Sequence, residues 1–140
     1  MSQQALPLPV VTGQPIEIVL PFLPKSRNQL AQMPWLHRRG YAEKWWNHLS
    51  RAVEGIGQYQ SVTVEMELWF GSNRTRDWQN YVGPIGVLAN ALVRGGVIPD
   101  DAPANFQVGP NAGITFMVDS NRLVPLKDRQ RTVFRITPEE

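Results

Sequence analysis

Cysteine is absent from the sequence, and histidine occurs only twice, as His37 and His48. Without cysteine the chain has no disulfide framework, thiolate zinc site, cysteine nucleophile or thiol redox chemistry. Two histidines are also too few for a histidine-rich metal site. These absences leave the carboxylates as the main candidates for any catalytic chemistry.

Long apolar runs are absent as well, because no stretch approaches the roughly 20 residues of a membrane span. The first residues, Met1–Ala5, do not place a basic region before an apolar one, as a secretory signal does. The chain has 140 residues, of which 42% are hydrophobic and 19% charged, as in a globular protein of one domain. We therefore expect a single-domain cytoplasmic protein without membrane association.

Lysine is scarce, because arginine accounts for all but three of the 14 basic residues. Arginine suits phosphate recognition better than lysine, since its planar guanidinium group makes two parallel hydrogen bonds to one anion. The formal net charge is +2, and the bases gather in two stretches, residues 25–44 and 127–135. These clusters fit either a solvated surface or a surface that binds nucleic acid.

Apolar periodicity predicts an α+β fold in one small domain, residues 16–140. Alternation of apolar and polar residues is typical of strands, and apolar stripes at helical spacing are typical of helices. We expect a mixed or antiparallel sheet of about four strands packed with two main helices, after a flexible arm at residues 1–15. The predicted strands are 16–20, 61–70, 114–119 and 132–137. The predicted helices are 45–56 and 84–94, and the stretches 25–40 and 120–131 are predicted loops.

Three carboxylates flank the second predicted helix. Asp77 precedes it, and Asp100 and Asp101 follow it, and Asp101 comes 24 positions after Asp77. A helix of about 11 residues spans only ~16 Å, so its flanking loops can fold back toward one site. Converging carboxylates suit Mg²⁺ and phosphodiester chemistry. The alternative is structural, because aspartate also caps helices and forms turns.

The motif around these carboxylates is Arg76-Asp77-Trp78-Gln79-Asn80, then Asn90-Ala91-Leu92, and then Gly95-Gly96-Val97-Ile98-Pro99-Asp100-Asp101. It resembles the RusA-like crossover junction endodeoxyribonucleases, a family of small Holliday junction resolvases, usually borne by phages or prophages of bacteria. The family has Arg-Asp-x-Asp-Asn, a helix with a lysine and Asp-Ala-Leu, and a glycine turn ending in Asp-Asp. The stretch Leu20–Asn28 is similar to the family's first strand and its Pro-x-x-x-Asn loop. The resemblance covers roughly residues 16–137.

This resemblance implies a homodimer that binds four-way DNA junctions in a basic cleft and resolves them with Mg²⁺, for which Mn²⁺ can substitute. It implies no small-molecule cofactor. Asp77 and Asp101 match catalytic positions, and the expected metal ligands are Asp77, Gln79, Asp100 and Asp101. We expect the DNA contacts on the basic residues Lys25, Arg27, Arg38, Arg39, Arg74, Arg76 and Arg94.

Three positions depart from the family pattern. Gln79 replaces the second aspartate of the motif, so it brings no charge and cannot act as a base. Gly86 stands where the family has its helix lysine, and Asn90 replaces the aspartate of Asp-Ala-Leu. Two other interpretations therefore remain beside an Mg²⁺-dependent endonuclease. One is a DNA-binding protein that has lost catalysis, and the other is a protein-interaction module built on Trp35, Trp45 and Trp46.

Overall fold

Five strands and four α-helices make up residues 15–139, the part of the chain that the computed structural model describes. The predicted N-terminal arm lies outside this part, apart from Pro15. In chain order the elements, with 3₁₀ helices labelled η, are β1 (Ile16–Leu20), α1 (Arg27–Ala31), α2 (Trp35–Ala52), β2 (Ser61–Phe70), η1 (Trp78–Tyr81), α3 (Gly83–Arg94), β3 (Phe106–Val108), η2 (Asn111–Gly113), β4 (Ile114–Val118), α4 (Leu126–Arg129) and β5 (Arg131–Glu139).

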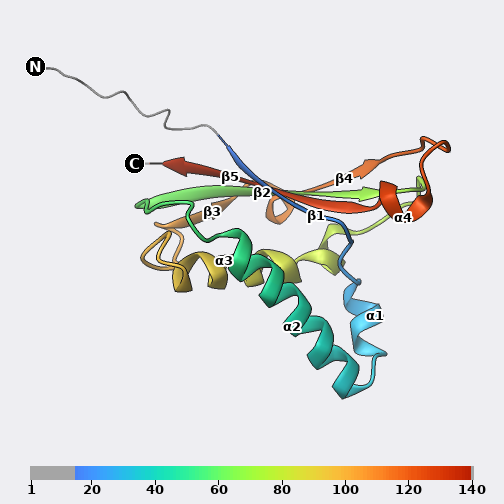
Figure 1. Cartoon of the computed structure of the whole chain (residues 1–140), viewed down its shortest axis with the longest axis horizontal. Coiled ribbons are helices and arrows are strands. Elements are labelled where there is room, and N and C mark those ends of the chain that lie inside the picture. Colours follow the sequence, from blue (N-terminus) through green and yellow to red (C-terminus); the bar gives the residue numbers. More distant parts are fainter. Residues whose placement is uncertain (1–14, 140) are drawn as a thin grey trace, which may run out of the picture.

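The strands form one mixed sheet (Figure 1), which confirms the predicted α+β class. β5 pairs antiparallel with β1 on one side and with β2 on the other. The far edge of β2 pairs in parallel with β3 and then with β4. The sheet thus has five strands rather than about four. Sequence reasoning missed β3 because three partly or fully exposed residues are too few to show an alternation.

β2 lies at the centre of the core. Its side chains Val62, Val64, Met66 and Leu68 are fully buried, whereas the alternate side chains point to the opposite face of the sheet. α1, α2 and α3 all lie on one side of the sheet (Figure 1), and α3 packs a stripe of buried apolar residues there. The other face carries most of the polar residues of the strands. We call it the open face.

The stretch predicted as a basic loop, residues 25–40, contains two helices instead. α1 begins with a capping box, in which Ser26 Oγ accepts from the Gln29 N–H and Gln29 Oε1 accepts from the Ser26 N–H. α2 begins at Trp35, ten residues before the predicted start. Its buried residues are Trp45 and Leu49, so its first ten residues show no apolar stripe. No helix between residues 15 and 139 is long and apolar enough to span a membrane.

α3 carries the chain from one end of β2 back to the other. The segment 71–82 follows the C-terminal end of β2, and the turn after α3 lies beside the beginning of β2 (Figure 1). There the Val62 N–H donates to the Asn105 carbonyl at 2.9 Å, and the Tyr59 N–H donates to the Val97 carbonyl at 2.7 Å. This path decides where the predicted carboxylates lie.

Candidate functional site

A cleft of about 1000 Å³ opens at the end of the sheet where β1 and β2 finish. Leu20 of β1 and Leu68 of β2 both pair with Thr132 of β5, so the segments after β1 and β2 leave the sheet side by side. The Thr132 hydroxyl donates to the Phe22 carbonyl at 2.7 Å and holds the first of these segments in place. The walls come from residues 21–26, residues 72–77, η1 and α4.

Positive charge dominates this cleft. Lys25, Arg74, Arg76 and Lys127 line it, and Asp77 is the only acidic residue among the described ones that do so. None of these four cations takes part in the ion pairs found between residues 15 and 139. The cleft therefore presents cationic groups that are available to an anionic ligand.

Arg76 is held in one position by the chain around it. Its guanidinium group donates to the carbonyl oxygens of Ser72 and Arg74, each at 3.2 Å. The same group lies over the ring of Phe70, 3.6 Å from the ring centroid. These contacts restrict the side chain without neutralising its charge, so a bound anion meets a pre-oriented guanidinium group.

Asp77 has a structural role and also lines the cleft. It is the N-cap of η1, and its Oδ1 accepts from the Gln79 N–H at 3.1 Å. The Gln79 residue is exposed and is not among the cleft-lining residues. The structure thus shows the capping role of Asp77 and places its carboxylate beside the cations of the cleft.

Asp100 and Asp101 lie elsewhere, in the exposed turn after α3, where Asp100 Oδ1 accepts from the Asp101 N–H at 2.8 Å. This turn is beside the beginning of β2, whereas Asp77 is near its end. A strand of ten residues spans about 30 Å. Within residues 15–139 no three His, Cys, Asp or Glu side chains are grouped to hold a metal ion. One chain therefore does not assemble the predicted ligand set of Asp77, Gln79, Asp100 and Asp101.

The predicted DNA contacts fall into three places. Lys25, Arg74 and Arg76 come together in the cleft. Arg27 begins α1, next to the cleft residues Ser26 and Gln29, while Arg38 and Arg39 lie on the exposed first turns of α2. Arg94 ends α3 and lies over the Trp46 ring at 5.7 Å, in a shallow pocket that Asn90 completes.

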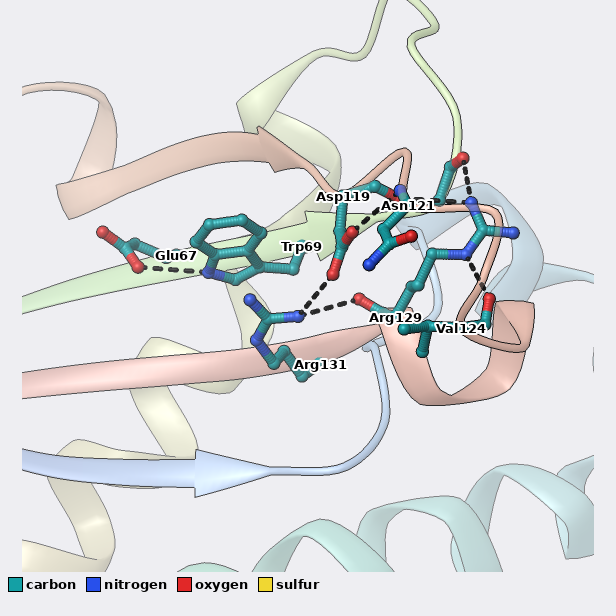
Figure 2. A network of polar contacts seen from close by, with 8 residues as sticks. Glu67, Trp69, Asp119, Asn121, Val124, Arg129 and Arg131 are labelled. Carbon is teal, nitrogen blue, oxygen red and sulfur yellow. Dashed lines mark hydrogen bonds and ion pairs between the residues drawn. The ribbon is translucent and has the colours of Figure 1, made fainter.

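The second basic stretch of the sequence is dispersed by the fold. Arg129 donates to the carbonyl oxygens of Val124, Gly71 and Asp119, at 3.1–3.3 Å. Arg131 pairs with Asp119 at 3.4 Å and lies 4.0 Å from the centroid of the Trp69 ring. Figure 2 shows these contacts binding the ends of β2, β4 and β5 together. Of the basic residues in that stretch, only Lys127 lines the cleft, although the predicted set omitted it.

Arg135, from the same stretch, lies on the open face between two acids. It bonds Glu17 at 2.9 Å and Glu67 at 2.5 Å. The bond from Arg135 holds the pKa of the Glu67 carboxyl below its ordinary value, an effect that burial opposes and a bond from Trp69 reinforces. The same contact raises the pKa of Arg135. Two acids thus neutralise Arg135, whereas the four cations of the cleft pair with no acid of the described residues.

The three tryptophans proposed as an interaction surface do not form one cluster. Trp45 is 2% exposed and meets the Phe22 ring edge-on at 5.0 Å, so it belongs to the core. Trp46 is half-buried between α2 and α3. Trp35 is 61% exposed at the beginning of α2. Of the three, only Trp35 is open to a partner over most of its surface.

The sequence matches no protein-family model and no curated protein. Seven chains of known structure show a likeness to it. Among them is the periplasmic domain of Helicobacter pylori MotB, with 10% identity over 94% of this chain and 78% of that chain and a TM-score of 0.33. A likeness at that TM-score carries no argument about fold or function.

Proposed function

We propose that this protein binds DNA, with phosphate groups of the backbone held in the cleft. The observation that carries the proposal is the set of four cations lining the cleft, none of which pairs with an acid of the described chain. Phosphate contacts by arginine and lysine provide essentially all of the affinity in non-specific DNA binding and a large share of it in specific binding. The anchored guanidinium group of Arg76 adds a donor whose orientation is already set.

The resemblance of Arg76–Asp101 to RusA-like resolvases supports a branched substrate. We propose that a homodimer binds a four-way junction, because a two-fold protein matches the symmetry of paired DNA arms. The aromatic rings of Phe22, Phe70 and Tyr81, which also line the cleft, give it apolar walls beside the cations. Such a surface suits a sugar–phosphate backbone with bases close by.

The test is a titration of DNA binding by the double variant that combines Arg74→Ala and Lys127→Ala. Both side chains are exposed, and neither takes part in a side-chain hydrogen bond or ion pair described for residues 15–139, so the variant folds normally. We expect the slope of log K against log salt to become shallower by about 2, since each phosphate contact contributes about 0.9. Affinity at 0.1 M salt falls by at least ~10-fold.

The matched control is Arg51→Ala, which removes an exposed arginine from the last turn of α2, remote from the cleft. It keeps the wild-type slope and affinity to within about twofold. If the control weakens binding as much as the double variant, general surface charge accounts for binding and the cleft does not. If the wild-type protein shows no salt-dependent DNA binding, the proposed function is wrong.

Metal-dependent cleavage of the bound DNA is a second candidate, which the position of Asp77 among the cleft cations favours. A single carboxylate is a poor metal site, and the other predicted carboxylates lie at the far end of β2. A second copy of the chain would therefore have to bring Asp101 to Asp77. Cleavage therefore requires the dimer, and a test of cleavage has to use two copies of the chain.

A further inference from the structure

α1 and the first ten residues of α2 project from the body of the protein. Figure 1 shows this pair of helices extending away from the sheet at the end where the cleft lies. No residue of α1 is buried, and the buried residues of α2 begin only at Trp45. We call residues 27–44 the α1–α2 projection. Most of its residues are exposed and accessible to a partner.

Two large apolar side chains stand exposed at the beginning of α2. Trp35 is 61% exposed and its neighbour Leu36 is 68% exposed. The guanidinium group of Arg39 lies 5.7 Å from the centroid of the Trp35 ring. An exposed indole that carries an arginine beside it offers both a flat apolar surface and a cation at one place.

The charge around this pair favours a polyanion as the partner. Residues 25–44 contain five lysines and arginines and a single acid, Glu43. That acid pairs with Arg39 at 3.4 Å, but both side chains are about two-thirds exposed, so the pair weakly offsets the positive charge. A second copy of the same surface would meet it with like charge, which argues against contact between copies here.

The projection is continuous with the cleft. Ser26 and Gln29, at the beginning of α1, line the cleft itself. Lys44, at the other end of the projection, lies 4.0 Å from the centroid of the Phe22 ring, which is another wall of the cleft. A DNA backbone held in the cleft is therefore bound next to the projection, and the same strand can follow its cations toward Trp35.

We infer that Trp35 stacks on an unpaired base of DNA whose phosphates occupy the cleft. The inference rests on the proposed function and adds a preference for sites where bases are unstacked, such as a branch point or a gap. A paired base inside an intact duplex hides its face, so Trp35 has nothing to stack on in linear DNA. Stacking of a base on an aromatic side chain does not depend on which base it is.

The experiment compares a linear duplex with a duplex of the same sequence that carries a two-nucleotide gap, with 2-aminopurine as one unpaired base. Trp35→Ala should weaken binding to the gapped DNA about tenfold and change duplex binding less than twofold. Wild-type protein should quench the 2-aminopurine fluorescence, and Trp35→Ala should lose this quenching. Trp35→Phe, which keeps an aromatic ring, should retain most of both effects.

Leu123→Ala serves as the matched control, because Leu123 is an exposed apolar residue (94%) outside the projection. It should leave both affinities unchanged. Equal affinities of wild type and Trp35→Ala for the gapped DNA would overturn the inference and leave cleft binding intact. A change of oligomeric mass caused by Trp35→Ala without DNA would overturn it too, by making Trp35 a contact between copies. If wild type binds neither DNA, the proposed function itself fails.

Discussion

Arginine side chains in this protein differ in whether an acid already neutralises them. Arg135 is bonded between Glu17 and Glu67, so its charge is satisfied inside the molecule. Arg129 is held by backbone carbonyl oxygens and ties loops together. Arg76 is also held by carbonyl oxygens, but it faces a cleft with little negative charge. The exposed fraction of an arginine side chain would not distinguish these roles, whereas its hydrogen-bond and ion-pair partners do.

Glu67→Gln tests the ion pair between Glu67 and Arg135. Because Arg135 lowers the pKa of Glu67 in the folded protein, ionisation of this carboxyl stabilises the fold at pH values above its unfolded pKa of about 4.3. The contribution is lost as the pH falls through the lower, folded pKa. We expect the free energy of unfolding in urea to fall by about 1–2 kcal/mol at pH 7.

The difference in the free energy of unfolding between wild type and Glu67→Gln should shrink as the pH is lowered below about 4.3. Glu65→Gln is the matched control, because Glu65 is exposed on the same face of β2 and forms no ion pair within the described part of the chain. Its effect should stay within about 0.5 kcal/mol at every pH. A deficit of Glu67→Gln that does not vary with pH would contradict the electrostatic explanation.

At the scale of elements, the connection from β3 to β4 has a tightly constrained backbone. Both strands pair with β2, so the chain leaves its edge after Val108 and rejoins it at Ile114. It does so through consecutive residues with positive φ, namely Asn111 at 59°, Ala112 at 54° and Gly113 at 73°. A Cβ atom on Gly113 would lie 2.8 Å from the Val64 carbonyl oxygen.

Gly113→Ala should therefore destabilise the protein by about 2–3 kcal/mol, through the left-handed backbone and the close contact with β2. Chemical denaturation measures the change. The matched substitution Asn111→Gly is in the same turn at an exposed position, and it should shift the free energy of unfolding by no more than about 0.5 kcal/mol. Similar losses for the two variants would mean that the turn is generally fragile and that the Gly113 contact is unimportant.

Elements with a strong local pattern were predictable from the sequence. β1 and β2 have the predicted bounds, and α3 begins within one residue of the prediction. The start of α2 was missed because an exposed helix has no apolar stripe, although the capping box of Ser26 and Gln29 was a signal for the helix before it. The cleft membership of Lys127 was unpredictable, because it depends on β5 pairing with strands more than sixty residues away.

At the scale of the whole molecule, the predicted carboxylate ligands lie at two separate positions in one chain, at Asp77 and at Asp100–Asp101. In the proposed dimer, Asp77 of one copy and Asp101 of the other copy can form one site, which a single chain does not form. Light scattering at micromolar concentration should give about twice the chain mass of 15.8 kDa. A monomer that keeps its junction affinity would remove the dimer from the proposal.

If the dimer nicks junctions in Mg²⁺, sites shared between copies predict complementation. Asp77→Asn and Asp101→Asn should each be inactive, and their mixture should recover about a quarter of the wild-type rate, because half of the dimers then contain one intact site. No recovery from the inactive variants would show that the carboxylates do not act across copies. If the wild-type protein binds junctions without nicking them, it is a DNA-binding protein without cleavage activity.

The position of β5 has a consequence for how the chain folds as it is made. This strand lies between β1 and β2, yet it is the last of the three to be synthesised, and Ile16 pairs with Ile136. Until residues 131–139 leave the ribosome, β1 has no partner among the described strands, and the edge of β2 that pairs with β5 is open. Pairings between such distant parts form slowly, and open apolar edges attract other chains. We therefore expect the nascent protein to depend on chaperones late in its synthesis, until this final strand closes the sheet.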